Sequence, residues 1–255
     1  MTFLAQGFEV VEELLDSEQL ALAREATADL IDLFRRQDPD VLAEGLSIGA
    51  ITERKPYRNP GVNFERLAFE PYLIGNLMAL DHRFFQVFAT RKLWSAATHL
   101  LDCAESAAVF HFSNLTRKPA HYGPALGWHR DCDNTYFVPT DDRMIRFLLP
   151  LQRMTQANGG TALVPKSHLG NSFRSNQPPS EPEPEDIFYP SVNPGAALVV
   201  HSKLVHGGAP NRSAQDRDVL VIQFGIAGSS LRFQADETLS LANRDAFLLF
   251  IQNSA

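Results

Sequence analysis

Apolar residues recur at steps of three and four positions near the start of the chain, and this spacing predicts an amphipathic helix. Asp16 followed by Gln19 has the pattern of a capping box, so we expect the helix to begin there and to run to about Arg36. Polar residues occupy its other side, which indicates a scaffold helix lying on a core. The apolar stripe consists of Leu20, Ala23, Thr27, Leu30, Ile31 and Phe34.

The next part of the chain alternates between interrupted and helical patterns. Prolines break up residues 38–66, where we expect no long element. Residues 69–102 return to helical spacing in two pieces. We expect these pieces to buttress a sheet.

From about residue 107 the pattern changes to short apolar runs separated by clusters of Gly, Pro, Asn and Asp, which is typical of strands and turns. Asn158, Gly159 and Gly160 are expected to form a hairpin turn, and Asn193-Pro194-Gly195 another. So many strands predict a jelly roll or barrel. The expected strands are 107–115, 127–132, 143–151, 160–164, 196–201, 204–207 and 217–226.

Residues 171–190 interrupt the strands with five prolines and three glutamates, a composition that does not fold by itself. One interpretation is a solvated linker. The other is a lid over an active site, because long loops in compact domains are often functional. The sequence does not choose between them.

The length of 255 residues fits one β domain with flanking helices. We expect residues 1–106 to be a mainly helical support, residues 107–230 a β core that includes the loop 171–190, and residues 231–255 a C-terminal tail. The 44% hydrophobic content is that of an ordinary globular protein.

Charge and composition narrow the range of partners. The net charge is −7 and no basic run stands out, so nucleic acid is not an expected partner. No apolar stretch of about 18 residues and no signal peptide is recognised, so we expect no membrane association. The only cysteines, Cys103 and Cys132, suit a reducing, cytoplasmic compartment.

The segment GWHRDCDN supplies the first candidate chemistry. His129 and Asp131 are two residues apart on an expected strand, so both side chains should leave the same face. A His-x-Asp pair alone is a weak signal. His206, inside a later expected strand, completes a set of two imidazoles and one carboxylate, the facial triad that leaves three positions open on a ferrous ion.

Arg217 begins a strand eleven residues after His206 and can reach the same cavity. A guanidinium there can pair in bidentate fashion with the remote carboxylate of a dicarboxylic keto acid. The alternative is a surface ion pair with Asp216 or Asp218.

These residues lie in motifs that resemble the phytanoyl-CoA dioxygenase-like (PhyH) branch of the Fe(II) and 2-oxoglutarate-dependent oxygenases. The matching segments are GFEVVEELLDSEQL at 7–20, GWHRD at 127–131, NGGTALVPKSH at 158–168 and PGAALVVHSKLVHGGAPNRSAQDR at 194–217. Residues 37–106 and the Pro/Glu-rich loop are unmatched. The resemblance implies a double-stranded β-helix, a cupin-like jelly roll, with iron held by His129, Asp131 and His206 and 2-oxoglutarate anchored by Arg217.

The chain departs from this family at one position. Two residues after the distal histidine the family commonly has a small hydroxyl residue, whereas this chain has Gly208, so one hydrogen bond to the co-substrate must come from elsewhere. Thr161 and Asn114 are candidates for that contact. The acidic Asp131 disfavours halogenation, because similar halogenases carry a small residue there.

Several neighbouring residues receive structural interpretations. We expect Trp128 to pack in the core, His168 to be structural and His201 to face away from His206. Arg146 interrupts an apolar run, where it either faces substrate or forms a buried ion pair.

Three basic residues, Arg117, Lys118 and His121, fall in an expected loop before the metal motif. They are solvated in one interpretation and contact an acidic substrate in the other.

Taken together, the motifs predict a dioxygenase that uses Fe(II), 2-oxoglutarate and O2 and releases succinate and CO2. We expect it to hydroxylate an unactivated carbon of a small organic molecule, such as a secondary metabolite. The alternatives are epimerisation, cyclisation or desaturation with the same cofactors, and a non-oxidative cupin-like metalloprotein. The substrate and the oligomeric state are not predicted.

Overall fold

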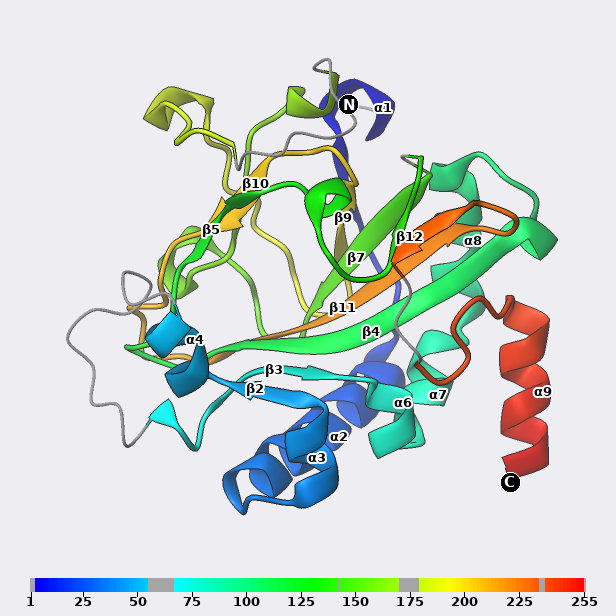
Figure 1. Ribbon diagram of the computed structural model, residues 1–255, viewed down its shortest axis with the longest axis horizontal. Helices are drawn as coiled ribbons and strands as arrows, with labels where there is room; N and C mark the ends of the chain where they lie inside the picture. Colours follow the sequence, from blue (N-terminus) through cyan, green and yellow to red (C-terminus); the bar gives the residue numbers. More distant parts are fainter. Residues whose placement is uncertain (1–2, 55–66, 142, 170–178, 234–236, 255) are drawn as a thin grey trace.

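The computed structural model describes residues 3–54, 67–141, 143–169, 179–233 and 237–254. Two antiparallel sheets form a double-stranded β-helix, a cupin-like jelly roll, with helices packed against the larger sheet (Figure 1). The larger sheet has the order β1 (Phe8–Val11), β9 (Ala197–His201), β7 (Met144–Pro150), β11 (Arg217–Ile226), β4 (Ala108–Lys118), β3 (Pro71–Gly75) and β2 (Gly45–Ser47).

The smaller sheet contains β5 (Leu126–His129), β10 (His206–Gly208) and β8 (Thr161–Leu163), with β10 in the centre. A separate two-stranded sheet joins β12 (Leu231–Phe233) to β6 (Val138–Pro139). In Figure 1, β5 and β10 lie above the long strands β4 and β11, and α2, α3, α6 and α7 lie below them. The described helices are α1 (Phe3–Gln6), α2 (Ser17–Arg35), α3 (Pro39–Ala43), α4 (Ile48–Arg54), α6 (Leu77–Leu80), α7 (Arg83–Phe88), α8 (Arg91–Leu101) and α9 (Arg244–Ser254).

Alternation along the strands divides the apolar side chains between two cores. On β11, Leu220 and Ile222 face the helices, whereas Val219 and Val221 face the smaller sheet. The core under the helices is aromatic. Trp94 on α8 is fully buried there, and its ring lies edge-on to nearby phenylalanine rings.

The first predicted helix is confirmed. It covers Ser17–Arg35, and the side chains of Asp16 and Gln19 form the reciprocal capping box. The interpretation of residues 69–102 as two helices is wrong, because the segment forms β3 and then three short helices. Five short strands, β1, β2, β3, β6 and β12, were missed, since two to five residues contain too little periodicity to be recognised.

The predicted hairpin at Asn158–Gly160 is also wrong. The strands on either side of it, β7 and β8, belong to different sheets. Residues Gln156–Asn158 form a 3-10 turn that ends at Gly159, which has a φ of +72°. Of Gly159 and Gly160, only Gly159 has a backbone conformation in the left-handed region. In the second predicted turn, Gly195 has such a conformation.

The Pro/Glu-rich loop is described only from residue 179 onward. Its described part is largely exposed, yet Phe188 pairs with Leu163 through two backbone hydrogen bonds and stacks on Phe8. Within the described residues, no helix has the length and apolar character needed to cross a bilayer. Whether the loop acts as a lid stays a prediction.

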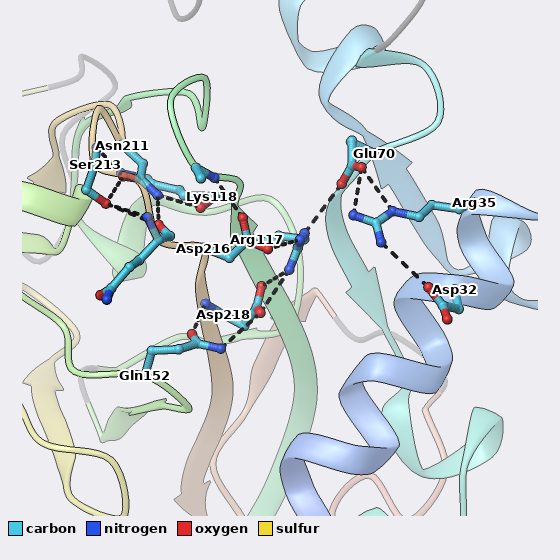
Figure 2. A network of polar contacts seen from close by, with 12 residues as sticks. Asp32, Arg35, Glu70, Arg117, Lys118, Gln152, Asn211, Ser213, Asp216 and Asp218 are labelled. Carbon is cyan, nitrogen blue, oxygen red and sulfur yellow. Dashed lines mark hydrogen bonds and ion pairs between the residues drawn. The ribbon is translucent and has the colours of Figure 1, made fainter.

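A buried ion-pair network connects the larger sheet to α2 (Figure 2). The guanidinium of Arg117 lies 2.7 Å from Asp218, 2.5 Å from Asp216 and 3.5 Å from Glu70. Glu70 in turn binds Arg35 of α2 at 2.8 Å. Burial by itself would lower the pKa of Arg117, but the two aspartates raise it above its usual value.

Replacing Arg117 with Met should lower the free energy of unfolding by about 3–5 kcal/mol, because buried carboxylates would lose their cation. The matched control is Arg143→Met, which removes a largely exposed arginine paired with Asp141 and should cost less than about 1 kcal/mol. Urea unfolding measures both. Equal small losses would contradict a structural role for this network.

A second stability prediction concerns Glu237, whose carboxylate accepts a hydrogen bond from the backbone N–H of Ser113. Burial raises the pKa of Glu237 from 4.5 to about 7. The folded protein therefore holds this proton more tightly than the unfolded chain does, and the resulting stabilisation, complete below about pH 4.5, is lost as the pH rises towards 7.

Glu237→Gln should accordingly gain stability relative to the wild type between pH 4 and pH 8, on the order of 2–3 kcal/mol. Urea unfolding at several pH values measures the difference. A difference that does not change with pH would contradict the prediction.

Candidate metal centre

The candidate metal centre begins at the end of β5. His129 is the last residue of this strand, and Asp131 opens a 3-10 turn, Asp131–Asp133. The expectation that both side chains leave one strand face is therefore wrong in its local geometry. The turn nevertheless brings Oδ1 of Asp131 to 3.7 Å from Nε2 of His129. A backbone hydrogen bond from Cys132 to the carbonyl of Ser202 fixes the turn.

The second histidine comes from the neighbouring strand. His206 on β10 pairs directly with His129 in the antiparallel register, and their ring centroids are 4.1 Å apart. Nε2 of His206 also lies 3.7 Å from Oδ1 of Asp131. The structure thus brings together all three residues that the sequence nominated, from two strands and the turn after one of them.

Both imidazoles are oriented in the same way by the backbone. Nδ1 of His129 lies 2.9 Å from the carbonyl oxygen of Gly127, and Nδ1 of His206 lies 2.9 Å from that of Leu204. Because a carbonyl only accepts, each of these Nδ1 atoms carries a proton, and in a neutral ring the lone pair then lies on Nε2, the atom 3.7 Å from Oδ1 of Asp131. Desolvation and the neighbouring His206 lower the pKa of His129 to about 3, which keeps this ring neutral.

The donor set fits a divalent transition metal. One donor atom from each of His129, Asp131 and His206 lies within 4.8 Å of the others. Oδ2 of Asp131 is buried and has no hydrogen-bond partner among the described residues, which is unfavourable unless a cation binds it. Two imidazoles and one carboxylate on one side of a cavity are the facial arrangement that ferrous iron accepts.

Arg146 on β7 holds the carboxylate from the other side. Its Nη1 donates to Oδ1 of Asp131 at 2.5 Å, and its Nε donates to Oε1 of Gln223 at 2.9 Å. Gln223 is itself fixed by a hydrogen bond to the carbonyl oxygen of Phe137. Burial would raise the pKa of Asp131, but Arg146 and the two histidines lower it, so the carboxylate is ionised. Of the two interpretations of Arg146, the structure contains the buried ion pair.

A cavity of about 270 Å³ opens beside the three candidate ligands. Arg217 lines it and is only 5% exposed. Among the described residues its side chain has no hydrogen bond or ion pair, and its Nε is buried without a partner. Burial lowers the pKa of Arg217 to about 10. The alternative of an ion pair with Asp216 or Asp218 is wrong, because both aspartates bind Arg117.

The two candidates for a further co-substrate contact also line the cavity. Thr161 is the first residue of β8, and its hydroxyl lies 3.8 Å from the sulfur of Met154. Asn114 projects from β4, and its Oδ1 is buried with no hydrogen-bond partner in the described part of the chain. Their positions permit a contact with a bound molecule, and their role stays a prediction.

For one cavity residue, the secondary structure predicted from the sequence was wrong. Lys118 was expected in a loop, but it is the last residue of β4 and lines the cavity. Its alternation with Asn114 and Thr116 would have revealed the shared face if the strand had been extended by three residues. Arg117 precedes Lys118 in β4 and points to the other face, while His121 is exposed and does not line the cavity.

The remaining aromatic and histidine residues lie outside the donor set. Trp128 is not a core residue as expected, because it is half-buried and its Nε1 donates to Glu181 at 3.0 Å. His168 is structural, with Nε2 2.9 Å from the carbonyl of Leu4. His201 does not belong to the donor set; its ring lies near those of Phe3 and His168, and its Nδ1 accepts a hydrogen bond from the backbone of Lys203.

Comparison with known proteins agrees with this arrangement. The family model described as phytanoyl-CoA dioxygenase (PhyH) matches residues 3–219. The dioxygenase trt7 of Aspergillus terreus is 32% identical over 99 residues, which cover 37% of this chain and 33% of that protein. The dioxygenase andF of Emericella variicolor is 38% identical over 80 residues, covering 31% and 26%. The matched segments thus span about a third or less of these relatives.

Solved structures share the fold at low sequence identity. EctD from S. alaskensis with bound Fe superposes with a TM-score of 0.68 at 20% identity, covering 95% of this chain and 81% of that one. EvdO2 from Micromonospora carbonacea var. aurantiaca, complexed with 2-oxoglutarate, gives a TM-score of 0.61 at 18% identity, covering 92% and 91%. At these identities the likeness establishes the jelly roll alone.

The donor set predicts that His129→Ala weakens binding of a divalent metal by more than about 100-fold, since even residues that only support a ligand contribute about 10–100-fold. Co(II) is a convenient probe, because its visible absorption reports the coordination of the ion. The control is His99→Ala, which removes an exposed histidine of α8. Unchanged Co(II) affinity in His129→Ala would place the metal elsewhere.

Proposed function

Because the chain belongs to the phytanoyl-CoA dioxygenase (PhyH) family, we propose that it is a non-haem iron dioxygenase that uses 2-oxoglutarate to oxidise a small organic molecule. One observation carries the proposal. The three donor residues and a buried arginine without a partner among the described residues, Arg217, line the same cavity. A metal and a dicarboxylic acid can therefore bind side by side.

In this proposal His129, Asp131 and His206 hold ferrous iron through two Nε2 atoms and a carboxylate oxygen. The chemistry that such an iron supplies is the reaction of dioxygen with 2-oxoglutarate, which yields succinate, CO2 and an oxidised substrate. The protein keeps both imidazoles in the required tautomer through the carbonyls of Gly127 and Leu204. It also keeps Asp131 ionised and oriented through Arg146.

The co-substrate is anchored at its far end by Arg217. The guanidinium is buried, so an ion pair with a carboxylate is stronger there than in water. An empty site would leave this charge without a counter-ion among the described residues, which favours binding of a dianion over a neutral keto compound. Thr161 and Asn114 are proposed to contact the keto acid nearer the metal.

The reaction on the prime substrate is proposed to be hydroxylation of an unactivated carbon. Epimerisation, cyclisation or desaturation needs the same metal and co-substrate and is decided by how the substrate lies in the cavity. The relatives named dioxygenases support oxidation in general. We also propose that the whole chain acts as one oxygenase domain, since the core beneath the larger sheet includes residues from Phe3 to Phe247.

A non-oxidative cupin-like metalloprotein is the competing hypothesis. It needs the three metal ligands but has no use for a buried arginine beside them. Formation of succinate from 2-oxoglutarate, even without the prime substrate, excludes this alternative, and it excludes a binding protein without turnover as well.

The proposal predicts a visible charge-transfer band when Fe(II) and 2-oxoglutarate are added to the protein without oxygen. Arg217→Met should raise the 2-oxoglutarate concentration for half-maximal absorbance by about 10- to 100-fold, since a bidentate ion pair is lost. Co(II) binding should be unaffected. The control is Arg212→Met, an exposed arginine that donates to the carbonyl of His121. Absence of the band in folded wild-type protein would overturn the proposal.

A further inference from the structure

A series of buried polar side chains from three neighbouring strands ends at the carboxylate of Asp131. His111 on β4, Gln223 on β11 and Arg146 on β7 are linked in that order by hydrogen bonds of 2.9 Å, and Arg146 donates to Asp131. All except Arg146, which is 7% exposed, are fully buried. Burying polar groups costs free energy even when they are paired, and the neighbouring Val221 on the same face of β11 is apolar.

A β-bulge brings His111 to this network. The register of β4 and β11 shifts after the pair Phe112–Gln223, and His111 is the extra residue. Bulges redirect side chains and are frequent next to active sites. Gly225 leaves room for the imidazole, because a Cβ atom at that position would collide with the His111 ring. The strand is therefore interrupted at the place where the network needs a side chain.

The orientation of the Gln223 amide is determined by its neighbours. The carbonyl oxygen of Phe137 can only accept a hydrogen bond, and Nε of Arg146 can only donate one. Nε2 of Gln223 therefore faces Phe137 at 2.8 Å, and Oε1 faces Arg146 at 2.9 Å. The second N–H of the amide donates to Nδ1 of His111, so that nitrogen carries no proton. Burial lowers the pKa of His111 to about 3, which keeps the ring neutral, as this contact requires.

The guanidinium of Arg146 is held on its faces as well as at its edge. Its central carbon lies 5.1 Å from the ring centre of Phe112 and 5.2 Å from that of Tyr136. Gln223 holds Nε, while Nη1 donates to Oδ1 of Asp131. This oxygen is the one that lies 3.7 Å from Nε2 of both candidate histidine ligands. The hydrogen bond to Gln223 thus connects the position of a candidate metal ligand to the central strand of the larger sheet.

We propose that Gln223 is a positioning residue for the candidate metal centre and acts on Asp131 through Arg146. This inference rests on the function proposed above. Gln223 holds the guanidinium, which in turn holds the carboxylate facing the two imidazoles. The donor set is thereby arranged before a metal arrives, so less conformational entropy is lost on binding. The competing view is that the network only connects β4, β7 and β11 and stabilises the sheet without affecting the metal site.

The informative variant is Gln223→Met, which keeps a similar volume and the same charge but removes the hydrogen bonds to Arg146, Phe137 and His111. Because the charge is unchanged, a change in metal affinity reports the arrangement of the ligands. Gln223→Met should weaken Co(II) binding by about 10- to 100-fold, the usual effect of losing a residue that supports a ligand. The visible absorption of bound Co(II) should change as well. If this variant does not fold, Gln223→Asn withdraws the amide from Arg146 and is measured in the same way.

The control is Trp94→Phe, which removes a different buried hydrogen bond, from Nε1 of Trp94 to the carbonyl oxygen of Phe88 in the core under the helices. It should lower the urea midpoint and leave the Co(II) dissociation constant within about twofold, since the site is distant and independent. A urea midpoint for each variant reports stability separately from metal binding.

A double-mutant cycle tests the path through Arg146. In an Arg146→Met background the connection to Asp131 is already broken, so adding Gln223→Met should change the Co(II) constant by less than about twofold. Additive effects of the two substitutions would show that Gln223 does not act through Arg146 and would overturn the proposal.

The outcomes distinguish the positioning role from the proposed function. If the wild type binds no Co(II), or if His129→Ala binds it equally well, the proposed function fails and the positioning role with it. If the wild type binds Co(II) and Gln223→Met lowers only the urea midpoint, with the affinity and the absorption unchanged, the function stands and the network is purely structural.

Discussion

The pairing of β5 with β10 is the constraint on which the candidate site depends. It sets His129 directly opposite His206. In each strand, the carbonyl oxygen of the residue two positions earlier accepts a hydrogen bond from Nδ1 of the histidine and so orients the imidazole. Asp131 then needs only one turn of chain to reach both Nε2 atoms at 3.7 Å. A shift of this register by one residue would send one imidazole to the opposite face of the sheet and break up the donor set.

The ends of β4 and β11 show how one pair of strands serves stability and binding at once. Strand alternation places Arg117 and Asp218 towards α2, where acids from several segments surround the arginine. The same alternation places Lys118 and Arg217 in the cavity, on the opposite face. Burying a charged side chain costs free energy on either face of the sheet. On one face the acids around Arg117 offset the cost, whereas on the other face Arg217 has no ion pair among the described residues, so a bound carboxylate would offset its charge.

The parts of the fold that follow from local pattern were predictable. The capping box at Asp16 and the strands of the β core are examples, and the three donor residues were recognisable from spacing and motif. Features that depend on contacts between distant segments were not. Arg146 is recognisable in sequence only as a charge within an apolar run, because its partner Asp131 comes from the turn after β5, a strand of the smaller sheet. Lys118 precedes Pro119 and was assigned to a loop, yet pairing with β11 extends the strand through it.

The candidate metal ligands and one side of the cavity wall come from different parts of the chain. The metal ligands and Arg217 come from segments with a recognisable motif, all within residues 127–217. The cavity wall also includes Ile51, Tyr72 and Leu73, which lie in the region 37–106, where no motif was recognised from the sequence alone. Because these residues enter through α4 and β3, at the edge of the larger sheet, they can vary without disturbing the β5–β10 pairing. Substitutions at this edge can therefore change the shape of the cavity without moving the candidate metal ligands.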